Sequence, residues 1–324
     1  MQPEYLYRIP ISRGERVRKV YALGFFDGVH LGHRALLEEA ARLARELSAK
    51  RAAITFDRHP QAHLGIPVPK LLTDCADRVR LLQLYGVEYV RLLPTNAAIM
   101  GLDWETFLEQ LEEDGAVGFV CGSDFRFGKG GQGNAGLLEE FCRQRGLACR
   151  VIPEQRLDGV RISSSHIRQL LEAGQAEQAA EFLGHPHLLT GKVTRGRQLG
   201  HTLGFPTANI PIAPFVLCPR HGVYATRAYV DGRSFPAVTN VGSRPTVQGT
   251  QVRTETWIQG LQEDLYGKRI WLEFYCFLRP EQRFDSLEQL KAAVEEDARK
   301  ALEYFKKNPE KPENSPLQLG KKML

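Results

Sequence analysis

VRKVYALGFFDGVHLGHRALLEEAARLAREL, residues 17–47, decides how the first half of this chain folds. Its opening run, VRKVYAL, is apolar enough to predict a buried strand over residues 17–23. The closing part carries apolar residues at i, i+3 and i+4 spacing, which predicts a helix from about Leu31. Between them, GFFDGVHLGH (24–33) holds three glycines and predicts a tight loop. A strand that turns into a helix in this way is typical of an α/β unit.

The same alternation continues to about residue 152. It predicts a parallel sheet covered by helices on both faces. Ligands of such sheets bind beyond the carboxyl ends of the strands, and the loop 24–33 lies at such an end. The further strands are expected at 51–56, 87–93, 116–121 and 147–152, and the further helices within 73–86, 103–114 and 134–146.

The pattern changes in the second half. Two helices are expected at 163–174 and 176–184, and from about Leu188 the chain shows strands and turns. Strands at regular spacing without helices between them predict a small antiparallel β-barrel. A closing helix begins at Ser286, where Ser286 and Gln289 fit a capping box. The barrel strands are expected at 222–230, 234–241, 254–261 and 269–278.

A domain boundary is therefore expected near 184–187. It divides the chain into a domain of residues 1–184, a domain of residues 185–308 and a tail, 309–324, whose polar composition predicts disorder. A length of 324 residues suits two cores better than one.

Composition narrows the class of protein. The chain is 43% hydrophobic and 25% charged, which is typical of a soluble globular protein. Its six cysteines form no C-x-x-C pair, and no run of about 18 apolar residues or signal-peptide pattern is present, so we expect a cytoplasmic location without a membrane partner. The net charge of +5 comes without a basic stripe interleaved with aromatics, so we expect no nucleic-acid partner. We expect a monomer or a weak homo-oligomer.

The loop 24–33 has the features of an anion site. It leads directly into a helix, whose first N–H groups and dipole attract negative charge, and glycines allow a phosphate to approach the backbone. His30 and His33 are three residues apart, so both side chains fall on one face of the first turn. Metal binding is the rival reading, although the H-E-x-x-H spacing is absent. These local features leave both readings open.

A second glycine run follows the strand expected at 116–121. GSDFRFGKG (122–130) narrowly fails to match a P-loop, and Gly128, Gly130 and Gly133 satisfy G-x-G-x-x-G. A match of this kind by itself is weak, and a dinucleotide-binding oxidoreductase remains a minor alternative.

In the second half, GKVTRGRQLGHTLGFPTANI (191–210) is either a linker or a nucleotide site. Thr207 and Asn209 are two residues apart, so their oxygens point the same way if the segment is extended. Mg²⁺ takes a few protein oxygens and completes its shell with phosphates and water.

At this point a family resemblance becomes specific. His30-Leu31-Gly32-His33 resembles the HxGH signature of nucleotidylyl transferases, and GFFDGVHLGH resembles the version found in bacterial bifunctional riboflavin kinase/FMN adenylyltransferases. TFDRHP (55–60), GSDFRFGKG and ISSSHIR (162–168) resemble further segments of that family. The resemblance implies a Rossmann-like nucleotidylyl transferase domain in which both histidines stabilise the α-phosphate of ATP and Arg168 holds its outer phosphates. It further implies ATP or phosphate contacts at Gly24, Phe26, Asp27, Gly28, Gly32 and Ser164, and flavin contacts at Asp124 and Phe125.

The barrel half resembles riboflavin kinases. LGFPTANI carries their PTAN motif, and NVGSRPTV (240–247), TETWIQGLQEDLYG (254–267) and FLRPEQRFDSLEQL (277–290) follow in order. The resemblance implies that Thr207 and Asn209 bind the Mg²⁺ of Mg-ATP and that Glu255 is the catalytic base. It also implies a nucleotide loop at Gly196 and Gly200 and flavin contacts at Arg279 and Trp257, although Trp257 stands where many relatives carry His.

The expected function is therefore synthesis of flavin cofactors. Riboflavin and Mg-ATP would give FMN, and a second ATP would give FAD with release of pyrophosphate. Two alternatives remain: a kinase whose first domain has decayed, and a non-enzymatic nucleotide-sensing or RNA-binding protein.

Overall fold

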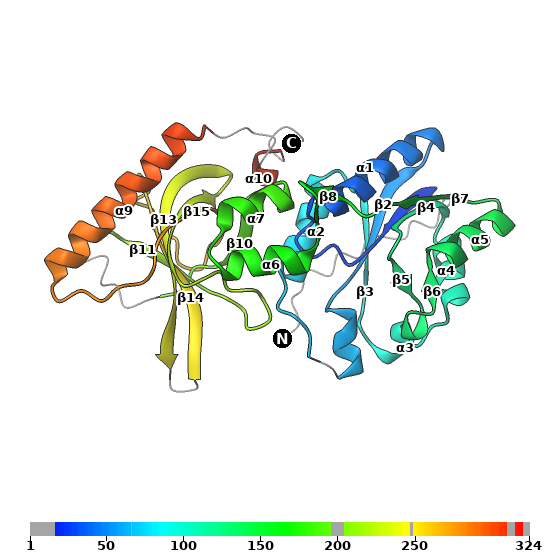
Figure 1. Ribbon diagram of the computed structural model, residues 1–324, viewed down its shortest axis with the longest axis horizontal. Helices are drawn as coiled ribbons and strands as arrows, with labels where there is room; N and C mark the ends of the chain where they lie inside the picture. The colour runs from blue at the N-terminus through cyan, green and yellow to red at the C-terminus, as the bar shows by residue number, and fades with distance from the viewer. Residues whose placement is uncertain (1–16, 66, 196–203, 247–248, 310–314, 320–324) are drawn as a thin grey trace. The chain divides into compact units, whose positions relative to one another are not determined.

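The computed structural model describes residues 17–65, 67–195, 204–246, 249–309 and 315–319 (Figure 1). Its contacts divide the chain into two units. The first contains Met1–Phe26, Gly32–Val68 and Val79–Gln155, and the second contains Asp27–Leu31, Pro69–Arg78 and Arg156–Leu324.

A five-stranded sheet of order β3-β2-β1-β4-β7 forms the centre of the first unit. Every neighbouring pair in it is parallel, so the prediction of a parallel sheet is confirmed. The strands are β1 (Lys19–Leu23), β2 (Lys50–Phe56), β3 (Tyr89–Leu93), β4 (Ala116–Gly122) and β7 (Ala148–Ile152).

Helices cover both faces of this sheet, as expected. Tyr21 and Phe119 share one face and pack in a core with Phe107 of α4 (Trp104–Glu113) and Leu138 of α5 (Ala135–Arg145). On the other face, a Cβ at Gly118 would lie 3.2 Å from Leu43 of α1 (Leu31–Glu46). The remaining elements between β1 and β7 are α2 (Cys75–Leu84), α3 (Ala97–Met100), η1 (Pro60–Leu64), η2 (Lys129–Gly131), β5 (Arg126–Phe127) and β6 (Gly133–Asn134).

The second glycine run does not form a dinucleotide site. Gly128 and Gly130 have positive φ, of 71° and 62°, and lie in the turn between β5 and β6, which pair as an antiparallel ribbon. A Rossmann fingerprint requires its glycines between a sheet strand and its crossover helix. The oxidoreductase alternative is therefore not supported.

The second unit contains an antiparallel barrel, as expected. Its six strands have the order β10-β15-β12-β13-β14-β11, with every neighbouring pair antiparallel. A bridge between Thr194 and Asn209 joins the two edges of the sheet, where the Thr194 N–H donates to the Asn209 carbonyl at 2.8 Å. The strands are β10 (His187–Lys192), β11 (Thr207–Pro211), β12 (Gly222–Val230), β13 (Arg233–Thr246), β14 (Gly249–Ile258) and β15 (Arg269–Arg279).

Helix α9 (Leu287–Lys307) covers one outer face of the barrel (Figure 1). Its Ala298 and Ala301 pack against Val223 and Val238. Ser286 caps the helix by accepting the N–H of Gln289 at 3.2 Å, as the capping box predicts. The remaining elements of this unit are β8 (Arg156–Leu157), β9 (Val160–Arg161), α6 (Ser164–Glu172), α7 (Ala176–Leu183) and α10 (Pro316–Leu319).

The predicted boundary near residues 184–187 lies inside the second unit, because α7 packs with the barrel and Ala176 belongs to its core. The division into 1–184 and 185–308 stays a prediction. The expected disorder of the tail is wrong for residues 315–319, because Ser315 is buried and donates to Glu273 at 2.7 Å. Of the helices in the described part of the chain, none is long and apolar enough to cross a membrane.

Candidate functional site

The carboxyl edge of the parallel sheet gathers two loops. Strands β1 and β4 are neighbours, with β2 and β3 on one side of them and β7 on the other, so the strand order reverses there. Such a switch point is where open α/β sheets bind ligands. Gly24 follows β1, and the exposed Asp124 follows β4. Next to Asp124, the Phe125 ring stacks on Phe127 with centroids 5.6 Å apart.

The backbone after β1 is strained. Phe26, Gly28 and Val29 have φ of 59°, 80° and 43°. Positive φ is unfavourable for a side chain with a Cβ, and most of all for a β-branched one such as Val29. Strain of this kind persists at sites where the surrounding structure enforces it. The loop is therefore held in one conformation by its contacts.

Phe26 supports the segment 24–33 from the protein interior. Its side chain is fully buried, so it contacts the protein interior. A Cβ at Gly24 would lie 3.0 Å from the Phe26 ring, which explains a glycine at that position. The Phe26 ring also meets the imidazole of His33 edge-on, with centroids 5.1 Å apart. His33 and the partly exposed Gly32 lie in the first turn of α1.

Asp27 and Arg168 form a buried ion pair, with Nη2 of Arg168 2.6 Å from Oδ2 of Asp27. The Asp27 carboxylate also accepts the N–H groups of Leu72 and Thr73, each at 3.1 Å. Nε of Arg168 donates to the Lys70 carbonyl at 2.7 Å. Within the described residues, Nη1 of Arg168 donates no hydrogen bond, so one guanidinium nitrogen is available to an anion.

Further contacts fix the same loop. The hydroxyl of Ser164 donates to the Asp27 carbonyl at 2.9 Å, and Ser163, not Ser164, caps α6. The N–H of Gly28 donates to the Thr73 hydroxyl at 3.2 Å. A Cβ at Gly28 would lie 2.7 Å from Leu72, so this glycine permits close packing of protein against protein.

His30 is uncharged near neutral pH. Burial lowers its pKa to about 3, and the neighbouring His185 and Arg168 lower it further. A neutral imidazole carries one N–H donor and one acceptor. His30 can therefore donate a hydrogen bond to a phosphate but brings no full positive charge to it.

The barrel places a row of polar residues across three strands. Asn209 on β11 lies opposite Glu255 on β14, and Glu255 lies opposite Asn240 on β13. The adjacent row on the same face is Thr207, Trp257 and Val238. The prediction that Thr207 and Asn209 share a face of an extended segment is confirmed by β11.

Asn209 fits a hard cation. The residue is 4% exposed, and its Oδ1 has no hydrogen-bond partner among the described residues. Its Nδ2 points to the Thr207 carbonyl at 3.5 Å, which leaves Oδ1 directed elsewhere. An unpartnered buried amide oxygen costs free energy unless a ligand takes it, and Mg²⁺ prefers oxygen ligands. Among the described residues, no group of three or more His, Cys, Asp or Glu side chains could hold a metal ion.

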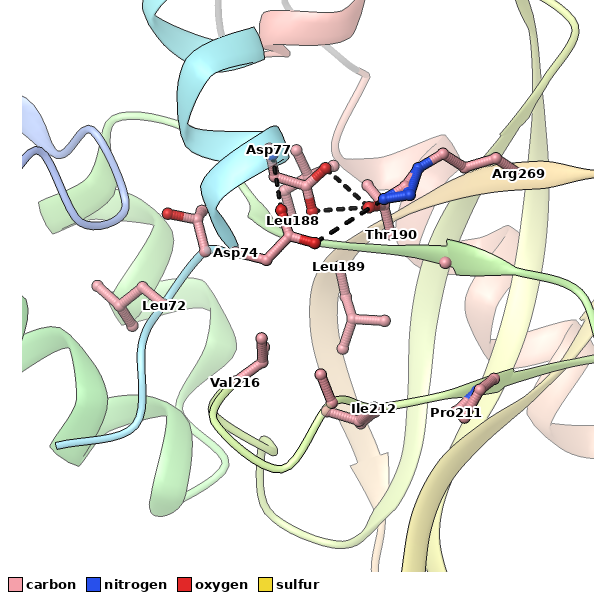
Figure 2. A pocket seen from close by; sticks show the side chains of 13 residues that line it. Leu72, Asp74, Asp77, Leu188, Leu189, Thr190, Pro211, Ile212, Val216 and Arg269 are labelled. Carbon is pink, nitrogen blue, oxygen red and sulfur yellow. Dashed lines mark hydrogen bonds and ion pairs between the residues drawn. The ribbon is translucent and has the colours of Figure 1, made fainter. Parts of the chain in front are cut away.

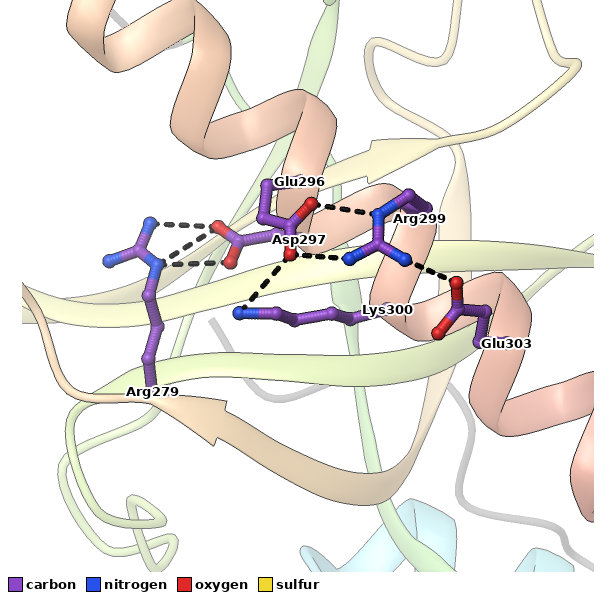
Figure 3. Close-up of polar contacts among 6 residues, drawn as sticks. All are labelled: Arg279, Glu296, Asp297, Arg299, Lys300 and Glu303. Carbon is purple, nitrogen blue, oxygen red and sulfur yellow. Dashed lines mark hydrogen bonds and ion pairs between the residues drawn. The ribbon is translucent and has the colours of Figure 1, made fainter.

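The flavin contacts expected in the barrel differ in character. The Trp257 ring packs against the α9 core and meets Phe205 edge-on at 4.6 Å. Arg279 instead makes an ion pair with the buried Asp297 of α9 at 2.7 Å (Figure 3). The neighbouring Arg299 pairs along the exposed side of the same helix with Glu296 and Glu303 (Figure 3). The guanidinium of Arg279 thus anchors α9 to the barrel.

Sequence reasoning did not single out Asn240. Its segment, NVGSRPTV, was expected only as a family feature, and its place beside Glu255 follows from strand register. The expected nucleotide loop at Gly196 and Gly200 lies outside the described residues.

A cavity of about 160 Å³ opens beside β10, with Leu72, Leu189 and Val216 among its apolar lining (Figure 2). On its polar side, the Thr190 hydroxyl is 2.7 Å from both carboxylate oxygens of Asp77. Burial, and then the charge of Asp74, raise the pKa of Asp77 to about 7. Asp77 therefore titrates near neutral pH.

Comparisons with known proteins agree in both halves. Residues 13–166 match the family model for FAD synthetase, and residues 183–305 match that for riboflavin kinase. The bifunctional riboflavin kinase/FMN adenylyltransferase of Escherichia coli K12 is 36% identical over 299 residues, which cover 91% of this chain and 95% of that protein. The same enzyme of Bacillus subtilis is 32% identical over 305 residues, with the same two coverages.

Among solved structures, a crystal structure described as a macrolide-efflux protein from Streptococcus pneumoniae aligns with a TM-score of 0.79 and 28% identity. The alignment covers 92% of this chain and 96% of that one. With both halves matched and relatives above 30% identity over 91% of its length, the chain belongs to the bifunctional riboflavin kinase/FMN adenylyltransferase family.

Proposed function

We propose residue roles for the two reactions of this family, phosphorylation of riboflavin to FMN and adenylylation of FMN to FAD. In the barrel, Glu255 accepts the proton of the terminal ribityl hydroxyl as that oxygen attacks the γ-phosphate of ATP. In the described part of the chain, no hydrogen bond or ion pair engages the Glu255 carboxylate. It is thus available to a substrate hydroxyl.

Thr207 and Asn209 would hold the Mg²⁺ that accompanies ATP, which supplies charge neutralisation on the transferred phosphate. The observation that carries this proposal is the buried Oδ1 of Asn209, which has no hydrogen-bond partner in the described part of the chain and lies on the residue paired with Glu255. The strand pairing fixes both side chains on one face, so the base and the nucleotide-binding oxygens are positioned by the same sheet.

For the second reaction, we assign the phosphates of ATP to the segment 24–33 and to Arg168. The FMN phosphate is already an anionic nucleophile, so this step requires charge stabilisation more than a base. The helix start of α1, the N–H donors of His30 and His33, and the unengaged Nη1 of Arg168 are suited to that task. Asp27 acts indirectly, because its carboxylate is occupied by Arg168 and by backbone N–H groups.

A timed incubation with riboflavin, ATP and Mg²⁺, with FMN and FAD separated by chromatography, tests the assignment. The parent chain should make FMN first and FAD second. Asn209→Ala should lose FMN formation and still make FAD from supplied FMN, because only the barrel site loses a ligand. Asn308→Ala, at the exposed end of α9, is the matched control and should keep both activities. Retained kinase activity in folded Asn209→Ala would remove this residue from the site.

The predicted division at residues 184–187 can be tested in the same assay. We propose that a fragment beginning near His185 makes FMN but no FAD. Because Ala176 of α7 contributes to the barrel core, a longer fragment that begins at Arg156 should be the more stable of the two. FAD formation by either fragment would contradict the assignment of the second reaction to the first half of the chain.

A further inference from the structure

Glu255 has a carboxamide on each side. Asn209 on β11 lies opposite Glu255 on one side, and Asn240 on β13 lies opposite it on the other. Directly opposed residues on a sheet have Cβ atoms about 4.5–5.5 Å apart, so substrate held at Glu255 is within reach of both. The proposed role of Asn209 is to bind the Mg²⁺ that accompanies ATP. The roles proposed above do not include Asn240.

Asn240 is held in a defined orientation. Its Nδ2 donates to Oε1 of Glu281 at 3.3 Å, from the segment between β15 and α9. Since the nitrogen is directed to Glu281, the amide oxygen Oδ1 is directed away and remains able to accept a hydrogen bond. Within the described residues, the side chain of Asn240 makes no other hydrogen bond.

Glu281 itself is fitted closely to the barrel. A Cβ at Gly242 would collide with its carboxylate, so the glycine allows Glu281 to lie over β13. The other carboxylate oxygen of Glu281 lies 3.8 Å from Nδ1 of the exposed His221. The Glu281–Asn240 contact is therefore built by packing against the strand.

The two rows on this face differ in chemistry. Asn209, Glu255 and Asn240 form a polar row, whereas Trp257 and Val238 in the adjacent row pack in the α9 core. Riboflavin is divided in the same way, into a ribityl chain of hydroxyls and an aromatic ring. The polar row matches the chain, and Trp257, the half-buried aromatic residue of the adjacent row, matches the ring.

We propose that Asn240, oriented by Glu281, binds the ribityl hydroxyl next to the one that is phosphorylated. It thereby selects a polyol chain over an alkyl chain that ends in a single hydroxyl. The inference rests on the proposed role of Glu255, since it places the reacting hydroxyl there. Asn240 is then a specificity residue for the kinase reaction.

The test compares riboflavin with a flavin whose N10 chain is 5-hydroxypentyl, which keeps the terminal hydroxyl and lacks the internal ones. For riboflavin, Asn240→Ala should lower kcat/KM about tenfold, mainly through KM, as expected for one lost hydrogen bond. For the analogue, the variant and the parent chain should be nearly equal. An equal loss with both flavins would overturn the proposal.

Variants of Glu281 separate orientation from charge. Glu281→Gln keeps an oxygen acceptor for Asn240 and should retain most of the preference for riboflavin, whereas Glu281→Ala should lose part of it. His221→Ala is the matched control, because it removes the other neighbour of Glu281 and should leave the preference unchanged. A preference that survives intact in Glu281→Ala would contradict the orienting role.

Equilibrium binding keeps this proposal separate from that of Glu255. Quenching of flavin fluorescence measures the Kd of both flavins without any proton transfer. Asn240→Ala should raise the Kd of riboflavin and leave that of the analogue unchanged. This result does not depend on the effect of Glu255→Gln on the rate of phosphorylation. Equal Kd values for parent and variant would count against Asn240 as a ligand, and a parent-like rate in Glu255→Gln would count against the base. An unchanged midpoint of urea denaturation would show that the variants are folded.

Discussion

The segment 24–33 and the polar row of the barrel, the two proposed phosphate sites, are built in opposite ways. Around Asp27, polar groups are satisfied by the protein itself, through Arg168 and the backbone of residues 72–73, and the loop is strained at Val29. In the barrel, regular strands present side chains without strain, and the Oδ1 of Asn209 has no partner within the ranges that the structure describes. The first region depends on loop conformation and the second on single functional groups. Substitutions should therefore affect the two regions differently.

Removal of both histidines should have the largest effect. His30→Ala together with His33→Ala should abolish FAD formation, because each lost donor to a developing phosphate charge costs about 10²–10³ in rate. Kinase activity should stay near that of the parent chain. Chromatography of products from riboflavin and from supplied FMN measures both. FAD formation at the parent rate would show that the segment 24–33 is not the phosphate site.

The two regions should also differ in their contribution to folding. Asp27→Ala leaves the Arg168 charge buried and unpaired, which costs about 3–5 kcal/mol in the free energy of unfolding. Asn209→Ala removes an unsatisfied oxygen and should change that free energy by less than about 1 kcal/mol. Urea denaturation of both variants makes the comparison. Equal destabilisation would mean that the two regions are built alike.

Glu255→Gln should slow phosphorylation about 100-fold while ATP binding and FAD synthesis from FMN persist, as expected when a general base is lost. The closest isosteric change keeps the packing of β14, so the effect isolates the proton transfer. Single-turnover kinetics with riboflavin measures it. A parent-like rate would transfer the role of base to another group.

The smallest effect concerns pH. The pKa of Asp77 is about 7 in the folded protein and 3.8 in the unfolded chain. The contribution of Asp77 to stability is therefore full below about pH 3.8 and is lost as pH rises through 7. Between pH 5 and pH 8 the parent chain should lose stability relative to Asp77→Asn. Burial lowers the pKa values of His30 and His187 to about 3, but these act equally in both proteins. Urea denaturation at both pH values gives the difference, and parallel pH profiles would contradict it.

Local patterns predicted most of the fold. The apolar run GVYATRAYV became β12 over the residues expected, and the capping box placed the start of α9. These signals survive because each depends on neighbours in sequence. The prediction of disorder for the tail was wrong at Ser315 because its partner, Glu273, is 42 residues away.

The candidate sites divide along the same line. The histidines, PTAN and Glu255 could be named from motifs, whereas the pairing of Asp27 with Arg168 joins residues 141 apart in sequence. The lowered pKa of His30 depends on burial, which no motif reports. Asn240 can be identified as a candidate only from the strand register that places it opposite Glu255. Contacts that depend on topology were therefore beyond the sequence patterns.

The bridge that joins the edges of the barrel has a consequence for exchange of amide protons. Asn209 offers its side-chain oxygen to the proposed nucleotide site, while its backbone carbonyl accepts the Thr194 N–H at 2.8 Å. One residue thus belongs both to the seam of the barrel and to the binding site. Opening of the seam would displace a ligand, and a bound ligand would hold the seam closed. The deuterium uptake of the Thr194 amide should then measure the occupancy of the proposed nucleotide site.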